Sequence, residues 1–330
     1  MLNLALLSYW HVHANDYARQ ADAHPDTQVV AVWDENAERG QREATARGVP
    51  FHANLADLLA DANIHGVIVT TPTSMHHEVM RAAAQAGKHI FTEKVIAATT
   101  AEATAIVAAA HEANVTLVVS LPRIVQREVI AILAALAAGT IGTPTYARVR
   151  LAHDGGLNTT QRPNGWLPAH FYNPEEAQGG ALMDLGCHPV YLLRAMLGMP
   201  THVSTTFGAY TARAVDDNAV AVFRYANGAI GVAESGFVSR GEPIRIEIHG
   251  TDGNIVFGAP HKEPQIATRD ADWQPLPVAE DAPSAFHQWV DAIQHGTSVE
   301  ENVALALDLT RLMEAAYASA ASGTPTPPAL

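Results

Sequence analysis

The sequence is poor in cysteine, in positive charge and in long apolar runs. One cysteine, Cys187, excludes an intramolecular disulfide and the paired spacings of zinc-ribbon or iron–sulfur sites, so we expect a reducing, cytoplasmic compartment. The chain has 20 Lys and Arg against 34 Asp and Glu, and a net charge of −14 repels a phosphate backbone, so we expect no nucleic-acid partner. The N-terminal apolar run is far shorter than the ~20 residues of a membrane span and follows no basic segment, so we expect no membrane association.

Apolar residues are abundant, at 48% against 16% charged, which indicates a folded chain with a large core. A length of 330 residues favours two domains.

The first part of the chain alternates short apolar runs with Ala-rich stretches of helical period. We expect strands at Leu2–Leu7, Val29–Trp33, Val49–His52, Val67–Thr71, His89–Thr92 and Thr116–Ser120, with helices between them. Such alternation predicts parallel strands with right-handed crossovers, the doubly wound sheet of a Rossmann domain, over residues 1–122.

After Pro122 the pattern changes to successive strands with few helices between them. We expect strands at Tyr146–Leu151, His202–Ala209, Asn218–Tyr225, Ala229–Ser235, Ile244–His249 and Asn254–Gly258. The sequence therefore predicts a second α/β domain over residues 123–330, with an open and largely antiparallel sheet. Helices are expected at about Val125–Ala138, His188–Leu197, Ala285–Gln294 and Val303–Ala321.

The turn after the first strand contains no glycine. Ser8-Tyr9-Trp10-His11-Val12-His13 stands where a dinucleotide-binding domain has Gly-x-Gly-x-x-Gly, whose glycines let the backbone approach a pyrophosphate. A phosphate could still bind backbone N–H groups near His11 and Val12, helped by the Ser8 hydroxyl. The alternative is a plain strand-to-helix turn without a ligand.

Asp34 follows the second strand, where an acidic residue accepts a hydrogen bond from the adenosine ribose 2′-hydroxyl. It therefore favours NAD over NADP. Asp34 could instead merely cap the next helix.

Two further strands end in polar motifs, and a third motif lies in the second half. Thr71-Pro72-Thr73-Ser74-Met75-His76 follows the fourth strand and Glu93-Lys94-Val95 the fifth. At a crevice edge, Lys94 could place an ammonium near a reacting oxygen, or it could be a surface lysine paired with Glu93. Gly179-Gly180-Ala181-Leu182-Met183-Asp184-Leu185-Gly186-Cys187-His188 holds an acid and a histidine four residues apart, a spacing that puts both on one helix face.

Together with Asp34, these motifs resemble the glucose-fructose oxidoreductase, inositol dehydrogenase and MocA-like (Gfo/Idh/MocA) family over essentially the whole chain. The family has Thr-Pro-Asn-x-x-His, Glu-Lys-Pro and Gly-Gly-x-x-x-Asp-x-Gly-x-His at these places. The resemblance implies a Rossmann domain, a second domain with an open antiparallel sheet, and a nicotinamide cofactor used on sugars or polyols. It also implies cofactor contacts from Thr71, Pro72, His76, Glu93 and Lys94. This chain departs from the family in the missing glycines and in Val95, which replaces proline.

A carbon that gives up a hydride must also lose its hydroxyl proton, and a histidine, with an unperturbed pKa of ~6.5, suits that step near neutral pH. The resemblance assigns this role to His188, with Asp184 orienting sugar and imidazole and Lys94 holding the oxygen. Outside this motif, a helix cap at Asp184 and a core histidine at His188 would be the ordinary interpretations.

Other candidates surround these residues. Arg123, after the sixth strand, and the loop residues Trp166, His170 and Tyr172 could line a hydroxyl-rich ligand, although packing and an ion pair would explain them equally well.

Seventeen histidines suggest metal binding, above all His11-Val12-His13 and His76-His77. The nearby acids Asp16 and Glu78 complete no familiar ligand spacing, so we expect no metal site.

The sequence thus predicts an NAD(H)-dependent oxidoreductase that interconverts a hydroxyl and a carbonyl on a sugar, cyclitol or related polyol. The alternative is a catalytically silent nucleotide-binding sensor or regulatory protein on the same fold. An open sheet also predicts a homodimer or a dimer of dimers.

Overall fold

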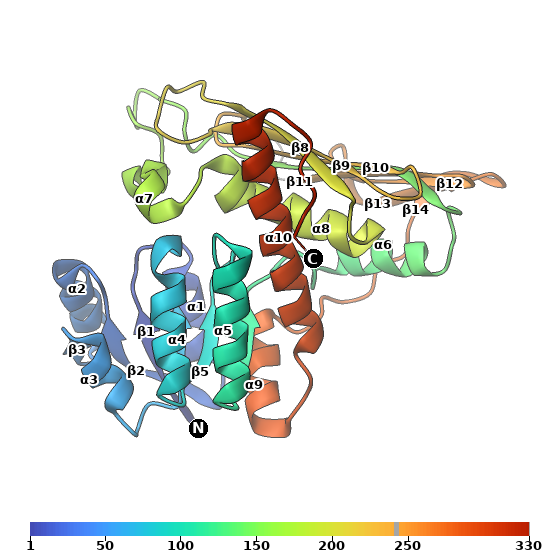
Figure 1. Ribbon diagram of the computed structural model, residues 1–330. Helices are drawn as coiled ribbons and strands as arrows, with labels where there is room; N and C mark the ends of the chain where they lie inside the picture. The colour runs from blue at the N-terminus through green and yellow to red at the C-terminus, as the bar shows by residue number, and fades with distance from the viewer. Residues whose placement is uncertain (241–243, 330) are drawn as a thin grey trace. The chain divides into compact units, whose positions relative to one another are not determined.

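The computed structural model describes residues 1–240 and 244–329, and the chain divides into two compact units. The first comprises Met1–Ser120 and Pro283–Leu307, and the second Leu121–Ala282 and Asp308–Leu330. Figure 1 follows the chain through both by colour. The C-terminal residue 330 is not described.

The first unit is built on a six-stranded parallel sheet with the strand order β3-β2-β1-β4-β5-β6. The order reverses between β1 and β4, which brings the carboxyl ends of β1, β4 and β5 together as the place where open α/β sheets bind ligands. The strands are β1 Leu2–Leu7, β2 Thr27–Trp33, β3 Phe51–His52, β4 Gly66–Val69, β5 His89–Thr92 and β6 Leu117–Val119.

Helices alternate with these strands as the apolar spacing predicts, and Figure 1 shows α4 beside α5. Side-chain caps begin several of them: Asn36 accepts from the Arg39 N–H at the start of α2, and Thr99 from the Glu102 N–H before α5. The helices are α1 Ala14–Ala23, α2 Ala37–Arg47, α3 Leu55–Ala60, α4 His76–Gln85, α5 Thr100–Glu112 and α9 Ala285–His295, with a 3₁₀ turn, η1, at Thr73–Met75.

Helix α9 completes the core of the first unit. Phe286 and Trp289 are fully buried there with Phe91 of β5, at ring-centroid distances of 5.4 and 5.9 Å. A Cβ on Gly66 would come within 2.9 Å of the Trp289 side chain, so the indole lies directly on β4. Residues 283–307 therefore pack with the first unit, whereas the sequence places all of 123–330 in the second.

The second unit holds an eight-stranded sheet with the order β14-β13-β12-β11-β7-β10-β9-β8. Only β7 and β10 pair in parallel, and the other neighbours are antiparallel. The strands are β7 Pro144–Ala152, β8 His202–Gly208, β9 Asn218–Arg224, β10 Ile230–Gly236, β11 Ile244–Gly250, β12 Gly253–Gly258, β13 His261–Thr268 and β14 Ala271–Pro275.

One face of this sheet is buried and the other is mixed. On β9, Ala219, Ala221 and Phe223 are at most 3% exposed, whereas Val220 on the opposite face is 39% exposed. The remaining helices are α6 Arg127–Ala137, α7 Pro174–Ala177, α8 Cys187–Leu197 and α10 Glu300–Ser322, with turns η2 Ala169–Tyr172 and η3 Leu182–Gly186.

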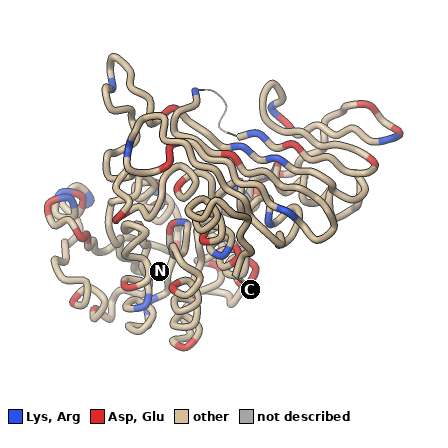
Figure 2. The backbone as a smooth tube through the Cα atoms, turned by 45° about the horizontal axis from the view of Figure 1, so that its top comes forward, with Lys and Arg blue, Asp and Glu red and all other residues tan. Residues whose placement is uncertain are grey.

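Charges on the open face alternate in sign. Arg148 lies 2.8 Å from Glu234 and 3.4 Å from Glu247, and Arg150 lies 3.5 Å from Glu234. Figure 2 shows basic and acidic residues interleaved along these strands. Among the described residues, no helix has the length and apolar composition needed to cross a bilayer.

Candidate functional site

In the turn after β1, Ser8 adopts the left-handed backbone conformation that glycine usually adopts. Ser8 has φ +79°, in the left-handed region, and its N–H donates to the Trp33 carbonyl at 2.6 Å. Most N–H groups of the turn are used internally: Tyr9 donates to Asp34, Trp10 to the Ser8 hydroxyl, and His11 to the Thr70 carbonyl. Within the described part of the chain, the N–H of Val12, a residue 43% exposed, has no such acceptor.

Asp34 directly follows β2, and its carboxylate accepts four hydrogen bonds. Its carboxylate accepts from the Tyr9 and Asn36 N–H groups, both at 2.8 Å, and from Nε and Nη2 of Arg39 at 2.9 and 2.7 Å. Arg39 also pairs with Glu35 and reaches the Ser8 hydroxyl at 3.3 Å. A ribose hydroxyl would therefore compete for an acceptor that already has four donors.

The segment after β4 holds a buried hydroxyl. Thr71 is 1% exposed, and its Oγ1 has no hydrogen-bond partner in residues 1–240 and 244–329. Pro72 beside it is buried. His76 places Nδ1 2.9 Å from the Val95 carbonyl and Nε2 3.3 Å from the Thr71 carbonyl. Burial lowers the pKa of His76, although both carbonyls act in the opposite direction.

Glu93 and Lys94 follow β5, and both are buried. The Lys94 Nζ lies 3.9 Å from Glu93 Oε1, to which the Lys94 N–H donates at 2.9 Å, and the Lys94–Val95 peptide is cis. Lys94 is 5% exposed, so it is not the surface lysine of the alternative interpretation. Burial alone would raise the pKa of Glu93, but the His11 and His13 imidazoles and the Lys94 ammonium hold that pKa well below its usual range.

These residues fit a dinucleotide at the carboxyl edge of the sheet. The Thr71 hydroxyl offers a buried polar atom that a ligand could satisfy, and the Ser8 backbone gives the tight turn before α1. The side chain of Trp10 is almost fully buried in the turn, at a position where the glycine fingerprint has no side chain.

In the second unit, Asp184 and His188 lie on a continuous helical segment. Leu182–Gly186 forms a π-helical turn that leads directly into α8. His188 is 5% exposed, and its Nδ1 lies 3.1 Å from the Tyr191 hydroxyl, which also accepts from the Arg123 N–H at 2.9 Å. The Tyr191 hydroxyl thus fixes the orientation of the imidazole.

The Gly-Gly pair before this segment is held by a buried acid. Asp216 accepts from the Gly180 N–H at 3.0 Å, from the Leu182 N–H at 2.7 Å and from the Tyr317 hydroxyl at 3.2 Å. A Cβ on Gly180 would meet the Asp216 carbonyl oxygen at 1.9 Å, so this close approach requires glycine. Burial raises the pKa of Asp216, while these hydrogen bonds act against the shift.

The loop candidates divide into packed and exposed residues. Tyr172 is buried, its hydroxyl has no partner within the described residues, and the Arg213 guanidinium stacks 3.9 Å above its ring. Trp166 is 42% exposed and donates to Asp154 at 3.1 Å. His170 contacts the Phe171 ring at a centroid distance of 5.2 Å.

Arg213 also borders a polar cavity of about 660 Å³ in the second unit. It is lined by Gly156, Leu157, Asn158, Asn164, Tyr210, Thr211 and Arg213.

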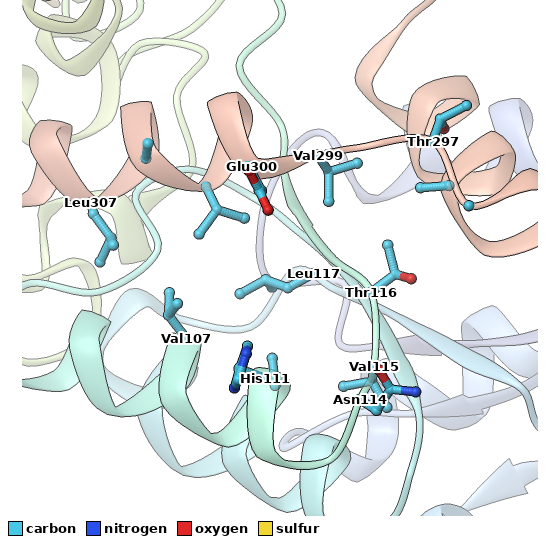
Figure 3. A pocket seen from close by; sticks show the side chains of 15 residues that line it. Val107, His111, Asn114, Val115, Thr116, Leu117, Thr297, Val299, Glu300 and Leu307 are labelled. Atoms are coloured by element: carbon cyan, nitrogen blue, oxygen red, sulfur yellow. The ribbon is translucent and has the colours of Figure 1, made fainter.

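A second cavity, of about 610 Å³, lies in the first unit and is mainly apolar. Figure 3 shows Val107 and His111 of α5 on one side and Glu300 and Leu307 of α10 on the other. No residue that the sequence analysis selected lines it.

Sequence reasoning missed the residues that support the candidates. Arg39, Tyr191 and Asp216 hold Asp34, His188 and the Gly-Gly pair in place. Of these, only Tyr191 had a usable signal, because it lies three residues after His188 on one helix.

Comparisons with known proteins agree with this architecture. Residues 11–121 match the family described as oxidoreductase family, NAD-binding Rossmann fold, and residues 129–256 match the GFO/IDH/MocA C-terminal domain. The chain is 28% identical over 286 residues to the 1,5-anhydro-D-fructose reductase of Ensifer adhaerens, covering 82% of each protein. It is 26% identical to the scyllo-inositol 2-dehydrogenase (NAD(+)) of Bacillus subtilis (strain 168), covering 87% of this chain and 81% of that protein.

Solved structures show the same fold. GenD2 from gentamicin A biosynthesis, in complex with NAD, is 25% identical with a TM-score of 0.82, covering 100% of this chain and 97% of that one. Levoglucosan dehydrogenase, in complex with NADH and levoglucosan, is 23% identical with a TM-score of 0.83 and full coverage of both chains. The predicted fold class and family resemblance are confirmed.

Proposed function

We propose, because this chain belongs to the Gfo/Idh/MocA family of NAD-binding oxidoreductases, that it interconverts a hydroxyl and a carbonyl on a sugar, cyclitol or related polyol. The curated relatives with sugar and cyclitol names support this substrate class. When bound, NAD supplies the hydride acceptor or donor, and the chain's own residues handle the proton and the substrate oxygen.

The observation that carries the proposal is the hydrogen bond between His188 and Tyr191 within the Asp184-to-His188 motif. For Nε2 of His188 to accept a proton, Nδ1 must carry the other one and donate it to the Tyr191 oxygen, 3.1 Å away. That oxygen also accepts the Arg123 N–H, so two donors hold it in place. The imidazole therefore has a supported tautomer in which Nε2 serves as the base.

Lys94 and Asp184 complete the proposed catalytic set. The Lys94 ammonium would stabilise negative charge on the substrate oxygen as the proton leaves, and Asp184 would orient the substrate hydroxyls and His188. Arg123, Trp166, His170 and Tyr172 are proposed to line the substrate pocket.

For the cofactor, we propose that Ser8, His11, Val12, Thr71, Pro72, His76, Glu93 and Lys94 contact NAD. Asp34 would favour NAD over NADP because its carboxylate has the same charge sign as a 2′-phosphate and because it engages Arg39, the nearby cation that could bind that phosphate.

Two further expectations belong to this proposal. The single cysteine supports a cytoplasmic, reducing location, and the mixed outer face of the eight-stranded sheet supports a homodimer or dimer of dimers.

The test is turnover, measured by cofactor absorbance on a panel of sugars, polyols and their keto forms. Replacing His188→Asn or Lys94→Ala should lower activity at least ~10²-fold, because a positioned acid–base group contributes that much. Melting temperature should stay nearly unchanged in both variants, and NADH affinity should stay nearly unchanged in the His188 variant.

The matched controls are His249→Asn and Lys262→Ala, whose side chains are exposed on β11 and β13. Activity within a few-fold of the parent in the His188 variant would refute the proton-transfer role, and its unfolding would identify a core histidine. NADH binding without turnover of any compound would favour the sensor alternative.

A further inference from the structure

Three potential metal ligands converge beside the turn that follows β1. His11 and His13 come from that turn, and Glu93 comes from the end of β5, about 80 residues later in the chain. Their ligand atoms all lie within 4.8 Å of one another. In residues 1–240 and 244–329 this is the only such group of three histidine, cysteine or acidic side chains.

We propose that His11, His13 and Glu93 form a binding site for a divalent transition-metal ion such as Zn²⁺, with a fourth position open. This goes beyond the proposed oxidoreductase function and reverses the expectation of no metal site. The acid that completes the set is Glu93, not the sequence neighbours Asp16 or Glu78.

The two distances from the imidazoles to the Glu93 carboxylate are close to those around a tetrahedral ion. Zinc–nitrogen and zinc–oxygen bonds of about 2.0–2.2 Å at tetrahedral angles place neighbouring ligand atoms about 3.4 Å apart. Nδ1 of His11 lies 3.4 Å from Glu93 Oε2, and Nδ1 of His13 lies 2.9 Å from the same oxygen. A shift of about half an ångström in His13 therefore makes room for the ion.

The donor set selects a class of metal. Two imidazoles and one carboxylate suit Zn²⁺ and similar transition ions, whereas Ca²⁺ and Mg²⁺ prefer oxygen ligands throughout. Three protein ligands leave one position for water or another small ligand, as in zinc sites that take part in reactions.

The Glu93 carboxylate is oriented by hydrogen bonds from neighbouring residues. The Tyr17 hydroxyl donates to Oε2, and the Lys94 N–H donates to Oε1. The Lys94 ammonium lies 3.9 Å from Oε1. Such outer contacts orient ligating carboxylates in metal sites.

Two of the three ligands are buried and the third is partly exposed, so the site is enclosed but can be reached from solvent. The side chains of His11 and Glu93 are 5% and 2% exposed, whereas that of His13 is 37% exposed. An ion could enter past His13. On binding it would replace the hydrogen-bonding proton between His13 and Glu93, so one proton would be released.

The experiment titrates the full-length, chelator-treated protein with Zn²⁺ against a chromogenic competitor, without any cofactor or substrate. We expect one tight Zn²⁺ per chain. Replacing His13→Ala or Glu93→Gln should weaken binding at least ~100-fold, since each removes one of three bonds to the ion. Circular dichroism checks that each variant is folded, and His11→Ala provides a third ligand deletion.

The matched control is His24→Ala. His24 and His287 form another close imidazole pair, with ring centroids 4.9 Å apart, but they belong to no three-ligand group among the described residues. Tight Zn²⁺ binding should survive in this variant. With Co²⁺ as a spectroscopic probe, the parent protein should give the intense visible bands of a tetrahedral site, and the His13 variant should lose them.

Absence of a tight equivalent in the parent protein would overturn the proposal. So would a tight site that persists in His13→Ala or disappears in His24→Ala. Because no step involves NAD or turnover, failure here leaves the oxidoreductase proposal intact, and failure of turnover leaves this site intact.

Discussion

At the scale of single residues, the pair of Asp34 and Arg39 determines which charge the end of β2 presents to a nucleotide. Asp34 binds two guanidinium nitrogens, and Glu35 neutralises Arg39 further. A cation that could hold a 2′-phosphate is thus present but engaged by two carboxylates. We therefore expect cofactor choice to depend on keeping the Arg39 guanidinium engaged.

Replacing Asp34→Ser should release Arg39 and move the preference toward NADPH. Removing the carboxylate eliminates a repulsion of order 1 kcal/mol or more, which corresponds to a gain in NADPH affinity of at least roughly fivefold. NADH affinity should fall or stay level. Fluorescence titration of both cofactors measures the ratio, with Asp57→Ser on the exposed face of α3 as the control. An unchanged ratio would remove Asp34 from the specificity determinants.

The sequence could bring candidate residues together where one motif held them, and could not where the partner was remote along the chain. His188 and Asp184 share one segment of ten residues, so the sequence alone indicates that they lie close together. His11 and His13 meet Glu93 only because β1, β4 and β5 are neighbours in the sheet, and nothing in the local spacing indicates that contact. The search for an acid near the histidines in sequence therefore stopped at Asp16 and Glu78.

At the scale of elements, the start of α4 depends on a buried neutral histidine. His76 is the first residue of the helix, and its ring nitrogens face the Val95 and Thr71 carbonyls. The ring thus lies between the segments that follow β4 and β5, and in its neutral form it donates to one of these two carbonyls. Because burial lowers the pKa of His76, the folded state resists its protonation.

Stability should therefore decline on the acid side of neutrality. The folded-state pKa of His76 lies below the unfolded value of ~6.5, so the unfolded chain binds a proton first as the pH falls. Between the folded-state and unfolded-state pKa values of His76, the free energy of unfolding falls by up to ~1.4 kcal/mol for each pH unit. Thermal unfolding at pH 7.5 and 5.5 should show a smaller acid-side loss in His76→Gln than in the parent protein. The half-buried neighbour His77→Gln should behave like the parent, and equal losses in all three proteins would exclude His76 as the cause.

Helices and strands with a strong apolar pattern lie close to their predicted positions, whereas strands with a polar sequence were not predicted. The predicted helices His188–Leu197 and Ala285–Gln294 each differ from α8 and α9 by one residue, and the strands of the first unit differ by a few residues at most. β13 and β14 were not predicted, because segments such as His261-Lys262-Glu263 and Ala271-Asp272-Trp273 show no alternation of apolar and polar residues. Their strand pairing comes from the neighbouring β12.

At the scale of the whole molecule, we expect the outer face of the eight-stranded sheet to contact a second copy of the chain. Val220 and Ile230 are exposed there at 39% and 42%, beside the Arg148–Glu234 ion pair. The opposite face is buried against the chain's own residues, at Ala219, Ala221 and Phe223 on β9. The sequence could not distinguish the two faces, because both are apolar on β9.

We expect light scattering to give the mass of a dimer or a dimer of dimers at micromolar concentration. Val220→Lys should shift that mass toward the monomer, because a lysine at the centre of the contact would be desolvated. Within one chain the lysine would lie opposite Glu234, so folding should be retained. Tyr210→Lys, at a residue 79% exposed outside the strands, should leave the mass unchanged. A monomeric parent protein would contradict the assembly.

The packing of α9 with the first unit has a consequence for how the protein is made. A ribosome delivers the six strands of the first sheet early, yet Phe286 and Trp289, which fill the core behind β4 and β5, emerge more than 160 residues later. During that interval the nascent first unit exposes an apolar groove, which a chaperone could cover. A fragment of residues 1–122 should accordingly be aggregation-prone, and adding residues 283–307 as a separate peptide should increase its protease resistance.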